Sequence, residues 1–491
     1  MRGVFFLLLA AGPWACGGDG ALPGRDAGGA PPDSGAEPDA ALDSPGGEPD
    51  SSSLPPFPKT LAPASELGER AGRRIARAVI HFHTPISHDA CDGDGWVDGV
   101  IDEECLADMR RGICETRQDI VFATDHDDFH AEVSFPDVFL MREGDEPVLD
   151  GLGRQIGSTI ACPDGTRPLF LTGEENEIMP VVEREHPGVT GTQDLHDLMN
   201  ASDLAAADAM RGTGALVLVP HAEHWTPERV VEIGATGIEL YNFHANLDRD
   251  IREEYLGLPA DDAIANVLIY ALDQDHPEPD LAFTAFFAEN GPDIDLFDTL
   301  LGRGVPITGL GGNDVHQNSA PGLLADGERG DSYRRLLRWL SNYLLVDELT
   351  ADAALEAIAA ARLYVAFDAF GTPAGFDFRA EDGCGDRTEM GGEVDLACEP
   401  ALTLDVPSVH ALDPSLPAPI VRASILRVGE GVREEVATAA GGQVVHVPAA
   451  SGVYRAVVWI TPEHYRPYFN GADAPYVREF PWVYSNAIRV R

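Results

Sequence analysis

Several short apolar runs in this chain end in residues that bind metal ions, and this pattern constrains the fold more than any other feature. The runs cover residues 77–83, 119–126, 169–175, 215–221 and 305–316, and they end in His-x-His, Asp-His, Glu-Glu, His and Asp-x-His. In a parallel α/β barrel the carboxyl ends of all strands meet on one face, which holds the active site. The sequence therefore predicts an α/β barrel in which His, Asp and Glu converge on one multinuclear metal site.

The segments between and after these runs divide the chain into two folded domains. Residues 261–272, 332–345 and 351–361 have helical apolar spacing, and strands that alternate with helices indicate a parallel sheet. We therefore expect a barrel domain over residues 70–365. Short strands separated by Gly, Pro and Asp loops follow, at residues 363–367, 401–404, 420–428, 444–447, 453–460 and 486–490. This pattern predicts a small all-β sandwich over residues 366–491.

The N-terminal residues have the composition of an export signal followed by a linker. Arg2, an apolar stretch and Ala15-Cys16 resemble a bacterial lipoprotein signal over residues 1–15, with Cys16 as the lipidated residue. Residues 16–69 are rich in Gly, Pro, Ala and Asp, which predicts a disordered tether. We expect an exported protein of the cell envelope, an outer-membrane lipoprotein held only by its lipid anchor; simple secretion is the alternative.

Charge and cysteine content narrow the possible partners and the compartment. The formal net charge is −48, and Lys59 is the only lysine, so no basic stripe is available for nucleic acid. Besides Cys16 the chain has six cysteines, an even number that suggests disulfides in an exported protein. Six cysteines can pair in 15 ways. Cys384 and Cys398 form the best local pair because they share one loop.

Taken in chain order, the strand-end motifs resemble those of the PHP (polymerase and histidinol phosphatase) superfamily. The motifs are His81-Phe-His83 with Ser87-His-Asp89, Thr124-Asp-His126, Gly173-Glu-Glu175, Pro220-His221, residues 237–242 and Asn313-Asp-Val-His316. The resemblance covers roughly residues 75–320. It implies a distorted (β/α)7-type barrel that binds two or three divalent ions of Zn, Mn or Fe and hydrolyses phosphoesters.

The resemblance also implies which side chains hold the metal ions. The implied ligands are His81, His83, Asp89, His126, Glu175, His186, His221, Asp314 and His316. Five of them would also take part in catalysis: His81, His83, His126, Glu175 and Asp314.

Three of these assignments leave alternatives open. His88 stands where the family has an aspartate, with Asp89 one residue later, and we favour Asp89. Glu174 is the alternative to Glu175. His186 has the spacing of a family ligand, but no strand-like run precedes it, so an ordinary surface histidine is an equal alternative.

Among the remaining polar residues, some could contribute to the pocket without binding metal. His130, His224 and His244 could line it, although each is more often an ordinary loop residue. Glu239 is expected to support the structure or a ligand rather than to bind metal itself.

Imidazole and carboxylate ligands suit Zn, Mn or Fe, and clustered cations lower the pKa of bound water toward ~7. In a chain with a single lysine, Arg, His or metal ions must neutralise a phosphoryl group, and we expect metal ions to do so here. We therefore expect a hydrolase in which metal-activated hydroxide attacks a small phosphorylated substrate. The alternatives are amide or ester hydrolysis on the same barrel, and a non-catalytic surface protein whose barrel binds metal for structure.

Overall fold

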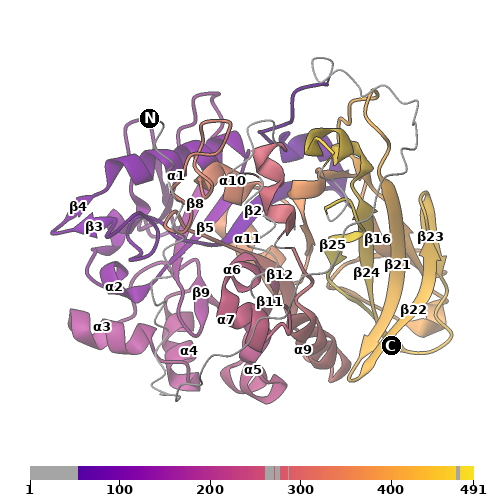
Figure 1. The fold of residues 1–491 in the computed structure, drawn as a ribbon. Helices are drawn as coiled ribbons and strands as arrows, with labels where there is room; N and C mark the ends of the chain where they lie inside the picture. Colours follow the sequence, from indigo (N-terminus) through magenta and orange to yellow (C-terminus); the bar gives the residue numbers. More distant parts are fainter. Residues whose placement is uncertain (1–53, 260–269, 271–276, 286, 472–475) are drawn as a thin grey trace, which may run out of the picture. The chain divides into compact units, whose positions relative to one another are not determined.

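Seven strands close into a barrel in the computed structural model, which describes residues 54–259, 270, 277–285, 287–471 and 476–491 (Figure 1). The barrel strands are β2 (Arg73–Phe82), β5 (Ile120–Asp125), β8 (Leu169–Glu174), β9 (Met179–Val181), β10 (Leu216–Val219), β11 (Gly237–Asn242) and β12 (Thr308–Val315). Strands β2, β5 and β8 are parallel, and so are β10, β11 and β12, with β12 pairing back onto β2. Strand β9 runs antiparallel to both of its neighbours, β8 and β10. The expected distorted seven-stranded α/β barrel is confirmed.

The register between neighbouring strands brings their carboxyl ends to the same level. Ile80 pairs with Phe122 on one side and with Gly312 on the other. Asp125 pairs with Glu174, so that His126 and Glu175 leave their strands side by side. Strands β5 and β8 are buried on both faces, which explains why their sequences are continuous apolar runs instead of alternating ones. The sequence runs therefore end together at one rim.

Helices with ordinary caps lie between the barrel strands. They include α1 (Glu103–Glu115), α2 (Asp127–His130), α3 (Thr192–Met199), α4 (Leu204–Gly212), α5 (Pro227–Ile233), α6 (Phe243–Leu247), α7 (Arg249–Glu254) and α9 (Gly291–Gly302). The Asp102 side chain caps α1 by accepting hydrogen bonds from two backbone amides, and Thr226 caps α5 just before Pro227. Among the described residues, none of the helices combines the length and apolar composition of a membrane-spanning segment.

The expected helix over residues 332–345 is wrong in its second half. Only α10 (Tyr333–Leu337) is helical, and β13 (Ser341–Val346) follows as a strand that is buried throughout. A short apolar run that is buried on all sides has no period that separates helix from strand. The helix expected over residues 351–361 is confirmed as α11 (Ala351–Ala359). Apart from Tyr270, the helix expected over residues 261–272 lies outside the described residues, as do the signal and the tether up to residue 53.

Strand β13 extends the barrel sheet toward the C-terminal strands. It pairs antiparallel with the first half of β2, and then with β14 (Leu363–Ala366). Strand β14 in turn pairs with β25 (Phe480–Ser485), so the hydrogen-bonded sheet continues across the boundary expected near residue 365. The sheet then passes through β24 (Gly452–Thr461) and β21 (Ile420–Gly429) to β22 (Val432–Ala439).

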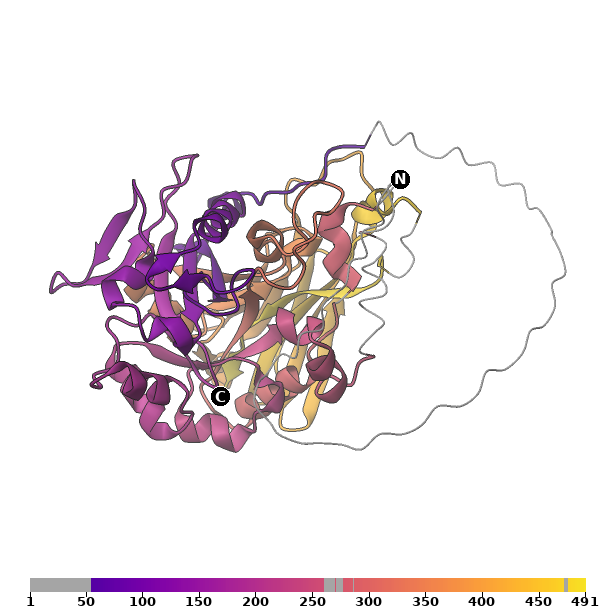
Figure 2. The same ribbon diagram turned by 60° about the vertical axis from the view of Figure 1, so that its left-hand side comes forward.

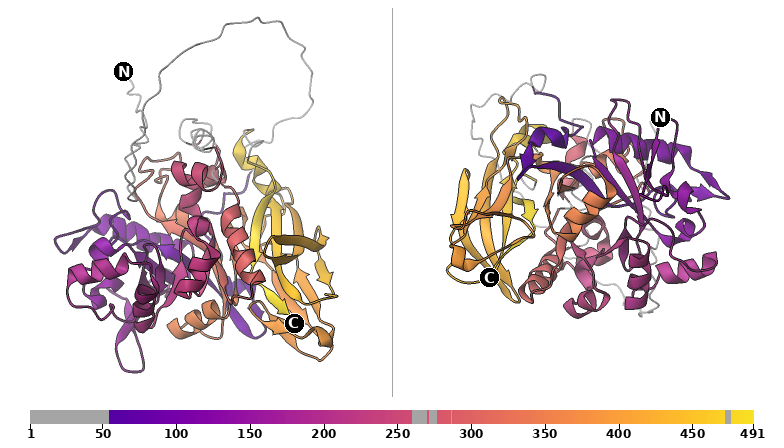
Figure 3. Two further views of the ribbon diagram at one scale, coloured as in Figure 1. Left: turned by 90° about the horizontal axis from the view of Figure 1, so that it is seen from below. Right: turned by 180° about the vertical axis from the view of Figure 1, so that it is seen from behind.

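A second sheet completes the C-terminal β-sandwich. Its strands are β17 (Arg387–Glu389), β16 (Asp377–Glu381), β19 (Ala401–Asp405) and β23 (Gln443–His446). Phe378 and Leu404 of this sheet share one buried apolar cluster with Ile425 and Val457 of the first. The two sheets, orange to yellow, stay together beside α9 when the view is turned (Figures 2 and 3).

Three disulfides join the six cysteines that follow Cys16. The pairs are Cys91–Cys105, Cys114–Cys162 and Cys384–Cys398. The local pair that we expected, Cys384–Cys398, is confirmed. The other two hold both ends of α1 against neighbouring loops. Because the loop that carries Asp89 leads into Cys91, the first disulfide also ties that loop to α1.

Candidate metal centre

His81 lies at the centre of the polar cluster at the barrel rim. It is fully buried near the end of β2, and its Nδ1 lies 2.7 Å from Oε1 of Glu239 in β11. A carboxylate can only accept in this hydrogen bond, so Nδ1 carries a proton and Nε2 is the nitrogen that faces the other carboxylates. Nε2 has no hydrogen-bond partner among the described residues and lies 3.4 Å from Asp314 and 3.9 Å from Glu175. This is the arrangement of a histidine oriented to bind a metal ion.

Asp314, in β12, lies close to more histidines than Glu175 or Asp89 does. Its oxygens lie 3.2 Å from Nε2 of His83, 3.2 Å from Nε2 of His221, 3.4 Å from Nε2 of His81, 3.4 Å from Nδ1 of His244 and 3.7 Å from Nε2 of His316. The side chain of Asp314 is only 4% exposed. One buried carboxylate therefore faces five imidazoles that come from four separate parts of the chain.

Glu175 is the second buried carboxylate of the cluster. Its Oε1 lies 3.9 Å from His81 Nε2 and 4.0 Å from His221 Nε2, and its Oε2 lies 3.0 Å from His126 Nδ1. His126 Nδ1 is also 2.7 Å from the Glu175 backbone carbonyl and donates to it, which turns His126 Nε2 toward Asp89. Glu175 is therefore placed between His81 and His221 on one side and His126 on the other, where it could bridge two ions.

The structure places Asp89, and not His88, against the cluster. The Asp89 carboxylate lies 3.8 Å from His83 and 3.5 Å from His126, and it accepts a hydrogen bond of 2.7 Å from the Ser87 hydroxyl. His88 instead pairs with Asp128 at 2.6 Å, where both side chains are half exposed.

Burial and opposite charge shift the pKa of most members of the cluster. Burial alone would raise the pKa of Asp314, but the charge of His81 and hydrogen bonds from other histidines hold that pKa well below its usual value. Despite its burial, the charges of His126, His81 and His221 lower the pKa of Glu175 to about 2. Burial would lower the pKa of His81, yet Asp314 and Glu239 raise it to about 9. Protons on the imidazoles thus balance the carboxylates, and divalent cations would replace these protons.

The donor set fits divalent transition metals. The clusters that could hold an ion include His81/His83/Glu175, His81/His221/Asp314, His83/Asp89/His126 and His244/Asp314/His316, and the ligand atoms of each lie within 4.8 Å of one another. Nε2 of His81 and Oε2 of Glu175 are buried without a hydrogen-bond partner among the described residues. Such atoms are costly in a protein interior unless something binds them. Imidazole and carboxylate are the ligands that Zn, Mn and Fe share.

Backbone strain accompanies the ligands. His81, His221 and Asp314 have φ values of 66°, 44° and 48°, in the left-handed region that non-glycine residues rarely adopt. Strain of this kind is concentrated at functional sites, where the surrounding structure enforces it.

Glu239 depends on a glycine in the neighbouring strand. Its Oε2 accepts hydrogen bonds from the His221 backbone amide at 3.0 Å and from the Asn242 side chain at 2.9 Å. A Cβ on Gly312 would lie 2.0 Å from Glu239 Oε1, so only glycine leaves room for this carboxylate. Glu239 therefore holds both His81 and His221, a contribution that the sequence suggested only in general terms.

His186 lies elsewhere than the sequence pattern suggested, and His244, expected at most to line the pocket, lies among the candidate ligands. His186 is not near Glu175 but belongs to a second buried group with His130 and Glu183. His244, at the start of α6, takes a place beside Asp314 and His316. His186 lies five residues after β9, so the strand-end rule could not locate it, whereas His244 lies two residues after β11, as His221 does after β10. The tripeptide Asn242-Phe-His244 at the end of β11 is the signal that could have identified His244.

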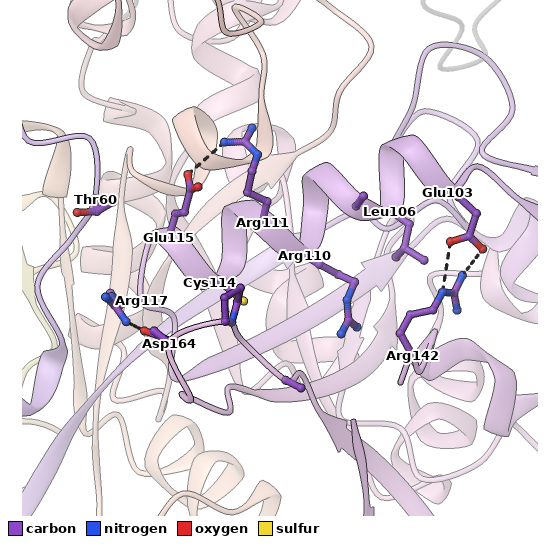
Figure 4. Close-up of a pocket in the computed structure, with 13 residues that line it drawn as sticks. Thr60, Glu103, Leu106, Arg110, Arg111, Cys114, Glu115, Arg117, Arg142 and Asp164 are labelled. Carbon is purple, nitrogen blue, oxygen red and sulfur yellow. Dashed lines mark hydrogen bonds and ion pairs between the residues drawn. The ribbon is translucent and has the colours of Figure 1, made fainter. Parts of the chain in front are cut away.

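A groove of about 580 Å³ lies away from this cluster, along α1 and the Cys114–Cys162 disulfide (Figure 4). Arginines line it, and each pairs with an acid: Arg110 with Asp145, Arg111 with Glu115, Arg117 with Asp164 and Arg142 with Glu103. These ion pairs neutralise the guanidinium groups. The acids of the groove are paired with arginines, whereas those of the barrel rim face histidines.

No protein-family model and no curated protein matches the chain. Among solved structures, the chain is similar to a two-domain protein from Bacteroides vulgatus ATCC 8482, described as containing a predicted PHP-like metal-dependent phosphoesterase. The identity is 12%, the match covers 86% of this chain and 98% of that one, and the TM-score is 0.35. The described residues themselves carry both features that the PHP resemblance implies, the distorted seven-stranded barrel and the His/Asp/Glu cluster at its rim.

Proposed function

We propose that this protein is a metal-dependent hydrolase that cleaves phosphoesters at the barrel rim. The observation that carries the proposal is the convergence of five imidazoles on Asp314, next to the second buried carboxylate, Glu175. A site that served only structure would seldom need so many ligands. The ions would be two or three of Zn, Mn or Fe.

The ligands would form two groups, one around Asp314 and one on the other side of Glu175. His81, His83, His221 and Asp314 would hold one ion, Glu175 would be shared, and Asp89 with His126 would hold a neighbouring ion. When bound, the ions would supply positive charge for a phosphoryl group and would lower the pKa of water so that it loses a proton and becomes the nucleophile, hydroxide. Glu239 keeps the proton of His81 on Nδ1, so that the lone pair of Nε2 stays directed at the site.

The histidines of the site differ in how far their side chains are exposed, and the more exposed ones mark the side from which a substrate would enter. His126, His221 and His244 are about 20% exposed, whereas His81 and His83 are at most 1% exposed. The first three therefore form a rim over a closed floor. A phosphoryl group that projects from a substrate would meet these three histidines before the floor.

The charges around the site favour an anion only when metal is bound. Among the described residues, the ion pairs of Asp314, Glu175 and Asp89 all involve histidines, without lysine or arginine. Positive charge for a phosphate must therefore come from bound cations and from imidazoles such as His244.

The test compares hydrolysis by metal-loaded wild type and by two variants, His81→Asn and Asp314→Asn. The substrates are p-nitrophenyl phosphate, its bis-ester, p-nitrophenyl acetate and an anilide. We expect cleavage of a phosphoester that each variant reduces by at least ~100-fold, because losing a ligand removes a few kcal/mol of transition-state stabilisation. His446→Asn, in the second sheet of the sandwich, is the control and should keep its activity.

The same assay distinguishes the other functions. Cleavage of the acetate or the anilide alone would replace the phosphoesterase by another hydrolase. A folded, metal-loaded wild type that cleaves none of the four substrates would contradict the proposed activity. Equal losses in His446→Asn and Asp314→Asn would show that the effect is general destabilisation.

A further inference from the structure

A second group of metal-type side chains lies on the other side of β8, apart from the cluster around Asp314. It consists of His130 at the end of α2, and of Glu183 and His186 in the loop after β9. Candidate ligand atoms of the three residues lie within 4.8 Å of one another. His130 and Glu183 are completely buried.

The buried polar atoms of this group lack hydrogen bonds. Both ring nitrogens of His130, both carboxylate oxygens of Glu183 and Nδ1 of His186 have no hydrogen-bond partner among the described residues. The His130 Nε2 and Glu183 Oε2 atoms are 3.8 Å apart, too far for a hydrogen bond. A buried carboxylate that is ionised and has no donor is strongly unfavourable unless a cation or a proton binds it.

His186 is oriented as a ligand. Its Nε2 lies 2.9 Å from the Val133 carbonyl, which can only accept, so Nε2 carries the proton. Nδ1 then keeps its lone pair, and it is the atom without a partner. A histidine whose far nitrogen donates to a carbonyl is typical of metal sites. Phe135 packs edge-on against the His186 ring at 5.5 Å and gives the group an apolar wall.

A second carboxylate increases the need for a cation. Glu174 is buried beside Glu183, and the two negative charges repel each other. Oε1 of Glu174 accepts a hydrogen bond from Asn176, but Oε2 has no partner among the described residues. Glu174 and Glu175 are adjacent, and side chains that alternate along a strand point to opposite faces. Glu175 therefore serves the rim cluster, and Glu174 faces the second group.

We infer that His130, Glu183 and His186 bind one divalent transition-metal ion of the zinc class, in a site separate from the rim cluster. Ligand atoms about 2.1 Å from a zinc ion lie about 3.4 Å apart in a tetrahedron, so small side-chain rotations would suffice. The ion would join α2 to the loop after β9 and so fix the segment that follows His126. The inference goes beyond the proposed hydrolysis and does not depend on it.

The test counts zinc per chain after metal removal and reloading with Zn²⁺, in folded wild type, Glu183→Gln and His186→Gln. We expect each variant to bind one ion fewer than wild type. Glu389→Gln, a buried glutamate in the sandwich, is the matched control and should bind as many ions as wild type. In crystals of zinc-loaded wild type, anomalous scattering at the zinc edge should show a peak between the three side chains, and this measurement needs no variant to fold.

Two results would overturn the inference. One is an unchanged zinc count in both variants together with no anomalous peak at this position. The other is loss of all zinc in both variants, which would show that the three side chains are not an independent site. Neither result depends on whether the protein hydrolyses phosphoesters, so failure here is distinct from failure of the proposed function.

Discussion

At the scale of single residues, the centre depends on side chains that hold other side chains. Asp314 gathers five imidazoles, and Glu239 orients the ring of His81 and holds the backbone of His221 beside it. Glu239 in turn needs the space left by Gly312. The chain of contacts predicts that a residue that binds no ion controls the affinity for ions.

Replacing Glu239 by Gln should weaken metal binding by roughly 10-fold, and by Ala roughly 100-fold. Gln keeps an acceptor for the Nδ1 proton of His81 but loses the charge, and Ala loses both. Metal affinity measured by competition with a chromophoric chelator checks this order. Equal affinities of Glu239→Ala and wild type would show that Glu239 does not position His81.

The strand-end rule explains which site residues the sequence could locate. His81, Glu175, His221 and Asp314 lie at or just after the ends of barrel strands, and strand register brings them together. His186 and His244 belong to a loop and to a helix start, whose paths depend on tertiary packing. The group of His130, Glu183 and His186 could not be predicted either, because nothing in the local sequence pattern indicates that α2 lies next to the loop after β9.

At the scale of elements, a buried ion-pair cluster joins a 3-10 segment to α10. Asp280, in the 3-10 segment η5 (Pro279–Ala285), accepts hydrogen bonds of 2.8 and 2.7 Å from Arg334 of α10, and it also pairs with Arg335. Hydrogen bonds from Arg334 and the nearby guanidinium charges outweigh burial and lower the pKa of Asp280 to about 2.

Stability should fall between about pH 4 and pH 2 because of this carboxylate. Its pKa is lower in the folded than in the unfolded state, so the stabilisation is complete above the unfolded value and is lost as the pH falls through about 2. The fall of this pKa from its usual value to about 2 corresponds to roughly 2.5 kcal/mol. Asp280→Asn should lose about this much at pH 7 and show a flatter pH dependence in urea unfolding. Asp347→Asn, which breaks only an exposed pair with Arg73, should change little.

The misassigned element shows where periodicity stops being informative. Residues 341–346 pair with strands on both sides and are buried on both faces, so every position is apolar or internally bonded. A fully buried strand and a fully buried helix both have apolar residues at nearly every position, so the sequence does not distinguish them. Some sandwich strands, such as β21 and β24, could be predicted because loops rich in Gly, Pro and Asp separate them, but β16, β22 and β25 were not among the expected strands.

At the scale of the whole molecule, the barrel and the sandwich share one sheet and a buried ion pair. Strands β13, β14 and β25 continue the sheet from one to the other. Asp298 of α9 accepts hydrogen bonds from Arg455 of β24 and Arg433 of β22, each at 2.7 Å. We therefore expect the two parts to unfold together.

Metal removal should lower the stability of the whole unit. Ions that bind only the native state stabilise it by mass action, so treatment with EDTA should lower Tm by roughly 5–10 °C. Calorimetry should show one transition that moves as a whole. An unchanged Tm would contradict a multinuclear site, and two transitions of which only one moves would contradict the coupling.

We also propose that Cys16 carries a lipid that anchors the protein in the cell envelope. The motivation is the signal-like composition of residues 1–15. Cys16→Ser should move the protein from the membrane fraction to the soluble fraction of cells, as followed by immunoblot. Wild-type protein that is already soluble and begins at another residue would refute the anchor.

The most direct test of the metal centre is the number of ions bound at the rim. Mass spectrometry of the elements in purified wild type and in the double variant Glu175→Gln/Asp314→Asn measures this number as a difference, independent of any other site. We expect two or three more ions of Zn, Mn or Fe per chain in wild type, with both proteins folded. Equal metal contents in the two folded proteins would contradict it.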